Sequence, residues 1–432
     1  MRILILHQFF YPDHSAVSQL MTDLAESLVE RGVEVTAVAG RGRYNGGERL
    51  SRREEYQGIK IERAWATSFG KRSIAGRLAD YLSFYVGATW KLLRVERHDI
   101  LLALTQPPLI GLIGLLIGRL RGMRVVALVQ DVYPDVAVAV GALKERSLGA
   151  RFFDFLNRRA LRGMDRIIVL GECMRDRIIA KVGAERASRI DIIHNWADGQ
   201  LIKPLANAAA NPFRLRHNLE RQFVVLFSGN FGLVNEFQTA LEAARLLRER
   251  KDITFLFVGD GVRADEIKEH ARRHQLENIR MLPYQPRADL CFSLTAGDAH
   301  LTTLAEGLAG LSVPSKTYAI LAAGRPVLFV GDVRSAVAKL VAENDCGAVV
   351  ASGQPEQLAQ VITEWAANPA RLVELGARAR ALFESRFERQ HAITAYLASF
   401  EKCLNDEKDN QPMTAEAGAT QSFGTVKSKA ES

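Results

Sequence analysis

The chain has few cysteines and no long apolar run, and these two shortages exclude several classes of protein. Its 432 residues include only four cysteines, which lie far apart and form no Cys-x-x-Cys pair. That spacing argues against a zinc site or a disulfide framework and favours a reducing, cytoplasmic compartment. No uninterrupted run of about 20 apolar residues occurs, so a membrane-spanning helix is not expected. Met1 to His7 enters a strand directly, so we expect no secretory signal.

Several motifs for catalysis and cofactor binding are also missing. The sequence contains no Asp-x-Asp, the carboxylate pair that commonly presents a divalent metal to a diphosphate, so we expect no metal requirement. No Gly-x-Gly-x-x-Gly opens the first predicted helix, which disfavours a nicotinamide dehydrogenase. We find no RNA- or DNA-binding motif. The sequence therefore predicts no cofactor and no nucleic-acid partner.

Positive charge is concentrated in the first half of the chain. Residues 1–200 contain 30 Lys and Arg against 22 Asp and Glu, a surplus of 8, whereas residues 201–432 contain 27 of each. A basic half of this kind is typical of a protein that meets an anionic membrane surface or an anionic substrate. The alternative, a scatter of solvated arginines, stays open.

Apolar strand-like runs alternate with amphipathic helical stretches, which predicts parallel sheets built from βαβ units. We expect strands at residues 3–7, 34–39, 59–64, 100–104, 125–131, 167–170 and 190–193, and then at 223–228, 253–258, 279–282, 299–302, 326–330 and 348–351. Glu54 and Glu55 follow two arginines and are interpreted as part of a charged loop.

The two sets of strands predict two doubly wound Rossmann-like domains, residues 1–200 and 201–385, that face a central cleft. A helix at 386–405 is expected to cross back to the first domain. The tail at 406–432 is poor in apolar residues and is expected to be disordered.

Three segments of the second half indicate a phosphate-binding site. Two predicted strands end in glycine-bearing turns, Phe227 to Gly232 and Phe257 to Gly261, and the third segment runs from Pro314 to Val327. Glycine lets the backbone approach a ligand closely, and the N-terminus of a helix favours an anion. We expect Ser315 to cap a helix there. The alternative is that the glycines only make tight turns.

Taken together, these motifs resemble those of family 4 glycosyltransferases, which are retaining enzymes with the GT-B fold, and in particular the bacterial type that assembles polysaccharide and O-antigen. The resemblance covers residues 1–404. Besides the three segments above, its markers are Gln130 to Asp135 and Ile193 to Asp198. In that family the C-terminal domain binds the nucleotide-sugar and the N-terminal domain receives the acceptor. The resemblance therefore implies donor contacts at Gly229, Asn230, Gly232, Gly259, Gly261, Ser315 and Lys316.

The chain departs from the family pattern at three positions. Many members carry two glutamates eight residues apart, and the corresponding positions here are Leu311 and Ala319. The nearest acid is Glu306, which cannot be assumed to replace either glutamate. A histidine of many relatives is replaced by Gln130.

Candidate reactive groups follow from the needs of sugar transfer, which are leaving-group stabilisation and a partner for the acceptor hydroxyl. Lys316 is expected to compensate the charge of the leaving diphosphate. Asp131 follows an apolar strand and is expected to contact the acceptor or the transferred sugar; the alternative is a helix N-cap. Gln130, Asp13 and His14 are further candidates on the acceptor side, and a turn role is an equal alternative for Asp13 and His14.

Two other features have competing interpretations. Residues 71–97 predict a basic amphipathic helix that could rest on a membrane carrying a polyprenyl-diphosphate-linked or other glycan acceptor, or could pack on its own sheet. His270 and His274 are four apart, but without an evident third ligand we interpret them as a solvated helix face.

We therefore expect a cytoplasmic glycosyltransferase, and peripheral attachment to the inner face of the cell membrane is compatible with its charge. Two alternatives stay open: a nucleotide-sugar epimerase of the same fold, and a non-enzymatic nucleotide-sugar-binding subunit of an assembly complex.

Overall fold

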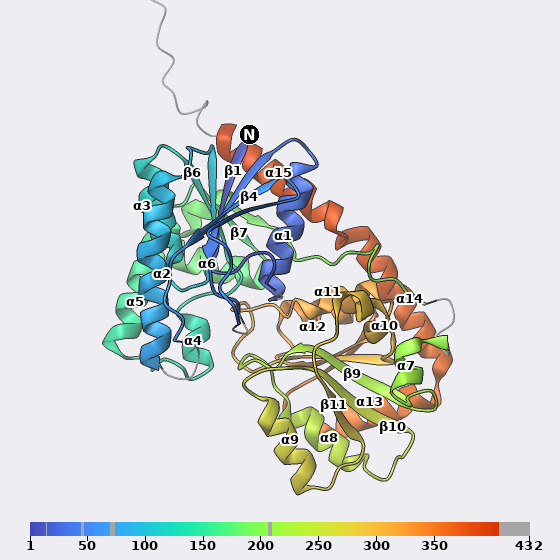
Figure 1. Ribbon diagram of the computed structural model, residues 1–432. Coiled ribbons are helices and arrows are strands. Elements are labelled where there is room, and N and C mark those ends of the chain that lie inside the picture. Colours follow the sequence, from blue (N-terminus) through green and yellow to red (C-terminus); the bar gives the residue numbers. More distant parts are fainter. Residues whose placement is uncertain (14, 45–46, 70–73, 206–209, 406–432) are drawn as a thin grey trace, which may run out of the picture.

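The computed structural model describes residues 1–13, 15–44, 47–69, 74–205 and 210–405. His14 and the tail at 406–432, on which sequence expectations were placed, lie outside these ranges. The chain forms two lobes, each with its own sheet, drawn one above the other in Figure 1.

The first lobe contains eight strands: β1 (Arg2–Leu6), β2 (Glu34–Gly40), β3 (Arg53–Tyr56), β4 (Ile59–Ala64), β5 (Ile100–Ala103), β6 (Arg124–Leu128), β7 (Arg166–Val169) and β8 (Ile190–Ile192). They are ordered β3-β4-β2-β1-β5-β6-β7-β8. In this order every strand except the edge strand β3 runs parallel to its neighbours. β1 lies at the centre, between β2 and β5, with Ile3 opposite both Val35 and Ile100. Side chains on both faces of the central strands are buried, as expected of a parallel sheet covered by helices.

The edge strand β3 is a correction to the charged loop expected around Glu54 and Glu55. It runs antiparallel to β4, with Tyr56 opposite Ile59. The two-residue turn between them, Gln57 and Gly58, has φ angles of 50° and 76°, which suit the twist of a tight hairpin. Charged side chains are common on an edge strand, because they discourage pairing with other chains.

The second lobe contains six parallel strands: β9 (Phe223–Asn230), β10 (Ile253–Asp260), β11 (Ile279–Leu282), β12 (Ala299–Leu304), β13 (Val327–Gly331) and β14 (Gly347–Val350). Their order is β11-β10-β9-β12-β13-β14. From β9 the next strands along the chain lie on one side of the sheet, and from β12 they lie on the other. The carboxyl ends of β9 and β12 are therefore a topological switch point, where ligands bind in open α/β sheets.

Helices cover both faces of each sheet. In the first lobe these are α1 (Ala16–Val29), α2 (Ile74–Arg94), α3 (Ile110–Leu120), α4 (Asp135–Ala139), α5 (Leu148–Gly163) and α6 (Glu172–Val182). In the second lobe they are α7 (Pro212–Arg216), α8 (Gln238–Leu246), α9 (Ala264–Arg273), α10 (Leu290–Thr295), α11 (Lys316–Ala322), α12 (Ala336–Glu343), α13 (Pro355–Ala367) and α14 (Pro369–Arg386). Within the described ranges, no helix is both long and apolar enough to cross a bilayer.

The final helix, α15 (Arg389–Asn405), returns to the first lobe and runs along its upper side in Figure 1. Tyr396, Phe400 and Cys403 are buried in the core of that lobe. The rings of Tyr396 and Trp196 make an edge-to-face contact at a centroid distance of 6.0 Å. The Ser399 hydroxyl also donates a hydrogen bond of 2.7 Å to Asp191 of β8. The last helix of the chain therefore completes the core of the first lobe.

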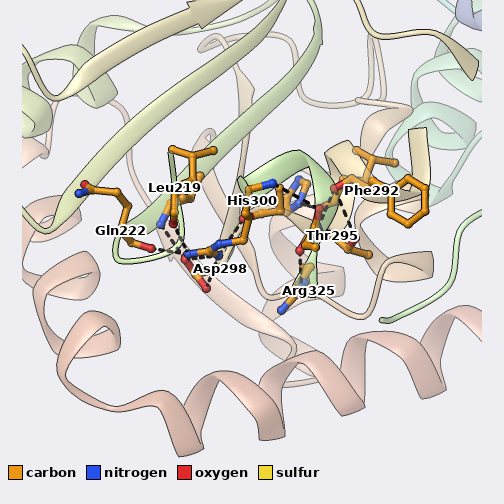
Figure 2. A network of polar contacts seen from close by, with 12 residues as sticks. Leu219, Gln222, Phe292, Thr295, Asp298, His300 and Arg325 are labelled. Atoms are coloured by element: carbon orange, nitrogen blue, oxygen red, sulfur yellow. Dashed lines mark hydrogen bonds and ion pairs between the residues drawn. The ribbon is translucent and has the colours of Figure 1, made fainter. Parts of the chain in front are cut away.

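A polar network joins the amino ends of the strands of the second lobe (Figure 2). Arg214, on α7, donates to both carboxylate oxygens of Asp298 at 3.0 Å and to the backbone oxygens of Leu219 and Gln222. Arg325, beside β13, donates to the backbone oxygen of Thr295. These residues lie at the sheet edge opposite the switch point, so the network holds the lobe together rather than forming part of the cleft.

Candidate functional site

The ends of β9 and β10 are shaped by glycines. Gly229 and Gly259 have φ angles of +135° and +141°, in a region that favours glycine. A Cβ added at Gly259 would lie 2.0 Å from the backbone oxygen of Gly229, so no side chain fits between the two strand ends. Gly261 is similarly close to the backbone of Phe231. Close approach of neighbouring backbone therefore accounts for glycine at 259 and 261, whereas Gly229 faces a side chain.

That side chain belongs to Lys316, the first residue of α11. A Cβ at Gly229 would lie 3.6 Å from Cε of Lys316. The ammonium lies 3.4 Å from the ring centroid of Phe227, a cation–π contact. It also donates a hydrogen bond of 3.3 Å to Oδ1 of Asn235. Burial lowers the pKa of Lys316 well below its ordinary value, because the charged form is poorly solvated there. The structure therefore brings Lys316 and Gly229 together at the switch point.

The expectation that Ser315 caps the helix is wrong. Its φ and ψ of −62° and −24° are already helical, and its side chain accepts no capping hydrogen bond. An N-cap residue normally has an extended backbone, which lets its oxygen turn back to the first turn of the helix. α11 itself spans seven residues. The expected cap is therefore absent, and Lys316 is the basic side chain at the start of this helix.

Asn235 holds this corner together, and sequence reasoning missed it. Its amide nitrogen donates to the backbone oxygens of Asn230 and Gly232 at 3.1 and 3.2 Å. Its amide oxygen accepts from Thr303 and Lys316, both at 3.3 Å. The side chain of Asn230 is exposed, whereas Asn235 is buried. The only signal in the sequence was its place five residues after Asn230, in the loop that follows β9.

Asp131 lies where the two lobes touch. It forms an antiparallel bridge with Ser312 of the second lobe, and the N–H of Val132 donates to the backbone oxygen of Leu311 at 2.8 Å. Burial raises the pKa of the Asp131 carboxyl, although hydrogen bonds from Ser312 and Gln106 act in the opposite direction. The N-cap alternative is wrong, because α4 begins at Asp135 with Pro134 as its N-cap residue.

The other acceptor-side candidates have structural partners. Gln130 and Asn195 are both buried and exchange two amide hydrogen bonds, of 3.3 and 3.2 Å. Asp13 accepts hydrogen bonds from the N–H groups of Ser15 at 2.8 Å and Tyr44 at 2.6 Å. Asp13 therefore has the turn role that was the alternative at this position.

The two positions of the family glutamates are occupied by packed apolar residues. Leu311 is buried in the apolar core, and Ala319 packs against that core. Glu306 lies just beyond β12 and is exposed. The two positions therefore contribute apolar packing.

Tyrosines gather around Asp131 on the first lobe, and sequence reasoning did not single them out. Burial raises the pKa of Tyr133, and the nearby Asp131, Tyr81, Tyr44 and Tyr85 raise it further. Tyr81 and Tyr85 are four residues apart on α2, so they share one helix face. Tyrosine combines an apolar ring with a hydroxyl, which suits contact with a sugar.

A group of metal-ligating residue types lies away from the cleft, on α8 and α9. The donor atoms of Glu242, His270 and His274 lie within 4.8 Å of one another. Glu242 is the third potential ligand, which sequence reasoning did not find. Its carboxylate accepts a hydrogen bond of 2.7 Å from Arg245 and lies 3.8 Å from Nε2 of His270. The His270 side chain is only 10% exposed, and its Nε2 is buried without a hydrogen-bond partner among the described residues, so the expected solvated face is wrong for this histidine.

Two family models and several known proteins match this chain. Residues 15–196 match the glycosyl transferase 4-like domain, and residues 211–382 match glycosyl transferases group 1. A protein named glycosyltransferase WbjE, from Pseudomonas aeruginosa, is 30% identical over 315 residues, which cover 73% of this chain and 77% of the relative. A protein named colanic acid biosynthesis glycosyl transferase WcaI, from Escherichia coli strain K12, is 25% identical over 79% of this chain and 86% of its own length.

Solved structures share the fold. Anabaena HepE, crystallised with UDP and glucose, superposes with a TM-score of 0.71 at 16% identity, covering 93% of this chain and all of HepE. Together with the two parallel sheets described above, this likeness confirms the predicted GT-B fold.

Proposed function

Because this chain belongs to the glycosyltransferases, with a glycosyl transferase 4-like domain followed by a group 1 domain, we propose that it transfers a sugar from a nucleotide-sugar to a glycan during surface polysaccharide biosynthesis. The named relatives WbjE and WcaI support this assignment. The observation that carries it is the placement of Lys316 beside Gly229 at the switch point of the second sheet.

The proposed donor site lies on the second lobe, at Gly229, Asn230, Gly232, Gly259, Gly261, Ser315 and Lys316. HepE was crystallised with UDP, which supports a nucleoside diphosphate as the ligand class. Breaking the bond between sugar and diphosphate adds negative charge to the leaving group. A fixed ammonium stabilises that charge in the transition state more than in the ground state.

Lys316 is suited to this role by its surroundings. Burial lowers the pKa of its ammonium, and an arriving diphosphate favours the charged form again. Donor binding is therefore coupled to the charge on Lys316. We propose that this lysine makes a divalent metal unnecessary, in keeping with the lack of an Asp-x-Asp motif in the sequence.

The proposed acceptor side is Asp131 with the tyrosines around it. A carboxyl whose pKa is raised can bind or release a proton closer to neutral pH. Asp131 would contact the acceptor hydroxyl or the transferred sugar. We propose retention of the anomeric configuration by family resemblance alone. The acceptor is proposed to be lipid-linked, at the cytoplasmic face of the inner membrane, and the basic first half of the chain supports this location.

Exchanging Lys316 for methionine tests the proposal, because methionine keeps much of the side-chain volume and removes the charge. With UDP-, GDP- and ADP-sugars and a polyprenyl-diphosphate-linked acceptor, we expect Lys316→Met to lower kcat/KM about a hundredfold. Lys339→Met, at an exposed position of α12, is the matched control and should retain activity.

Three outcomes would contradict parts of the proposal. Unchanged kinetics in Lys316→Met would remove that lysine from the mechanism. Conversion of the donor sugar without acceptor, seen by NMR, would indicate an epimerase. Nucleotide-sugar binding without turnover across the acceptor panel would indicate a binding subunit.

A further inference from the structure

Helix α2 is apolar on two opposite faces. Phe84, Ala88 and Leu92 point into the first lobe and are fully buried. A surface helix normally presents polar side chains on its other side. Here the outer side carries an apolar stripe, and its members are between 47% and 68% exposed: Leu78, Leu82, Val86, Trp90 and Leu93. Steps of three and four residues keep this stripe on one side of the helix over its length.

Two neighbouring helices also carry exposed apolar residues. α3 packs against both α2 and α5, and the three lie together at the outer side of the first lobe in Figure 1. Their exposed apolar residues are Leu116 and Leu120 on α3, and Leu148, Phe152 and Phe155 on α5. Of the twenty exposed large hydrophobic residues in the described ranges, ten lie on these three helices. We call these ten side chains the outer apolar face. Such a concentration is typical of an interaction surface, whereas single exposed residues are not.

Basic side chains accompany the outer apolar face. The three helices contain eight Lys and Arg (Arg77, Lys91, Arg94, Arg119, Arg151, Arg158, Arg159, Arg162) and two acids (Asp80 and Asp154), a surplus of 8 − 2 = 6. The whole chain has a surplus of 8. The Arg94 guanidinium lies 4.1 Å from the centroid of the Trp90 ring, so apolar and cationic groups are combined at one point of the face. Lys91 is buried and paired with Glu62, and Arg119 and Arg158 pair with Asp165 and Asp154, so the charge that faces outwards comes mainly from the other arginines of these helices.

We infer that the outer apolar face binds an anionic lipid surface, with α2 lying in the headgroup layer. Helices that lie in a membrane interface have this composition: leucine, tryptophan and phenylalanine that enter the lipid, and arginine or lysine that meets anionic headgroups. The charge disfavours a second copy of this chain as the occupant. A twofold contact would oppose two surfaces of the same positive sign.

The position of this face relates it to the cleft, and this step rests on the proposed function. β4 ends at Ala64, at the carboxyl edge of the first sheet, and the chain continues through Trp65 and Phe69, which are 55% and 66% exposed, before α2 begins. Trp65 and Asp131 therefore both follow strands at the carboxyl edge of the first sheet, β4 and β6, with three strands between them. A lipid-linked acceptor could keep its chain in the bilayer while its polar head enters the cleft.

Vesicle binding with matched variants tests the inference. The probe is a vesicle of phosphatidylethanolamine and phosphatidylglycerol, compared with phosphatidylcholine alone. We expect the full chain to sediment with the anionic vesicles and only weakly with phosphatidylcholine. Leu82→Glu/Val86→Glu should lower the partition coefficient at least about tenfold. The control Leu246→Glu/Val373→Glu places the same charges at exposed positions of α8 and α14 and should bind as the unaltered chain does.

The readouts separate this inference from the proposed function. Thermal unfolding should be unchanged in both double variants, since all four side chains are exposed. Nucleotide-sugar binding by calorimetry reports on the second lobe without a membrane. Lost vesicle binding with retained nucleotide binding supports the inference. Equal vesicle binding by both double variants overturns it, as does a dimer by light scattering that Leu82→Glu/Val86→Glu dissociates. Neither of these outcomes affects the donor-site proposal.

Discussion

At the scale of single residues, Gly259 has the least room for a side chain at the cleft. Its missing Cβ would lie 2.0 Å from a backbone oxygen, and its φ of +141° is unfavourable for other residues. We expect Gly259→Ala to lower the free energy of unfolding by about 3 kcal/mol. The ends of β9 and β10 would have to move apart to make room for the methyl group, and they would then lose their hydrogen bonds. Urea denaturation measures the change in free energy.

Gly149, near the start of α5, provides the control. A Cβ added there meets nothing within 4 Å. Gly149→Ala should be neutral or stabilising by up to about 1 kcal/mol, since alanine favours a helix. Equal stability of Gly259→Ala and the unaltered chain would contradict the close approach of β9 and β10.

Sequence reasoning was successful for residues with a local role and failed where the partner is distant in sequence. The glycines at the ends of β9 and β10 were recognisable because a glycine directly after an apolar run commonly marks the end of a buried strand. Ser315 was misjudged, since a serine before a helix fits an N-cap and only the backbone angles show otherwise. Asn235 was missed because its partners Thr303 and Lys316 are 68 and 81 residues away.

At the scale of elements, α15 contributes to a lobe formed by the other end of the chain. Phe400 is fully buried in the core of the first lobe. We expect Phe400→Ala to lower the free energy of unfolding by about 3–5 kcal/mol, through lost burial and the cavity left behind. The neighbouring Glu401 is exposed, so Glu401→Ala should change the free energy of unfolding by no more than about 0.5 kcal/mol. Similar denaturation midpoints for the two variants would show that α15 is not part of that core.

The parallel strands could be predicted because their apolar runs are buried on both faces, and α15 because its apolar residues recur at helical spacing. β3 could not, since a charged edge strand has the composition of a loop, and only the Gln57-Gly58 turn indicated a hairpin. For α2, periodicity alone did not separate the residues that face the sheet, such as Leu92, from those that face outwards, such as Leu78.

At the scale of the whole molecule, Asp23 connects the two lobes and the final helix. Its carboxylate lies 3.8 Å from Arg287 of the second lobe and 4.0 Å from Arg389 of α15. Burial raises the pKa of the Asp23 carboxyl from 3.8 to about 6; the two arginines oppose this shift, while Glu26 and Asp198 add to it.

The raised pKa predicts a pH dependence of stability. Between pH 3.8 and about 6 the folded chain binds more protons at Asp23 than the unfolded chain does. The stabilising contribution of Asp23 is therefore complete below pH 3.8 and is lost as the pH rises through about 6. Relative to Asp23→Asn, the unaltered chain should lose stability across this window, by up to about 1.4 kcal/mol per unit of pKa shift. Parallel denaturation curves at each pH measure the difference, and a constant difference would contradict the raised pKa.

The last helix also determines the order in which the protein can mature on the ribosome. The second lobe leaves the exit tunnel with its six strands already synthesised, but the first lobe, made earlier, still lacks Tyr396, Phe400 and Cys403. Nascent domains generally fold in the order of their synthesis. In this chain the half that is translated first cannot complete its core until α15 has left the exit tunnel.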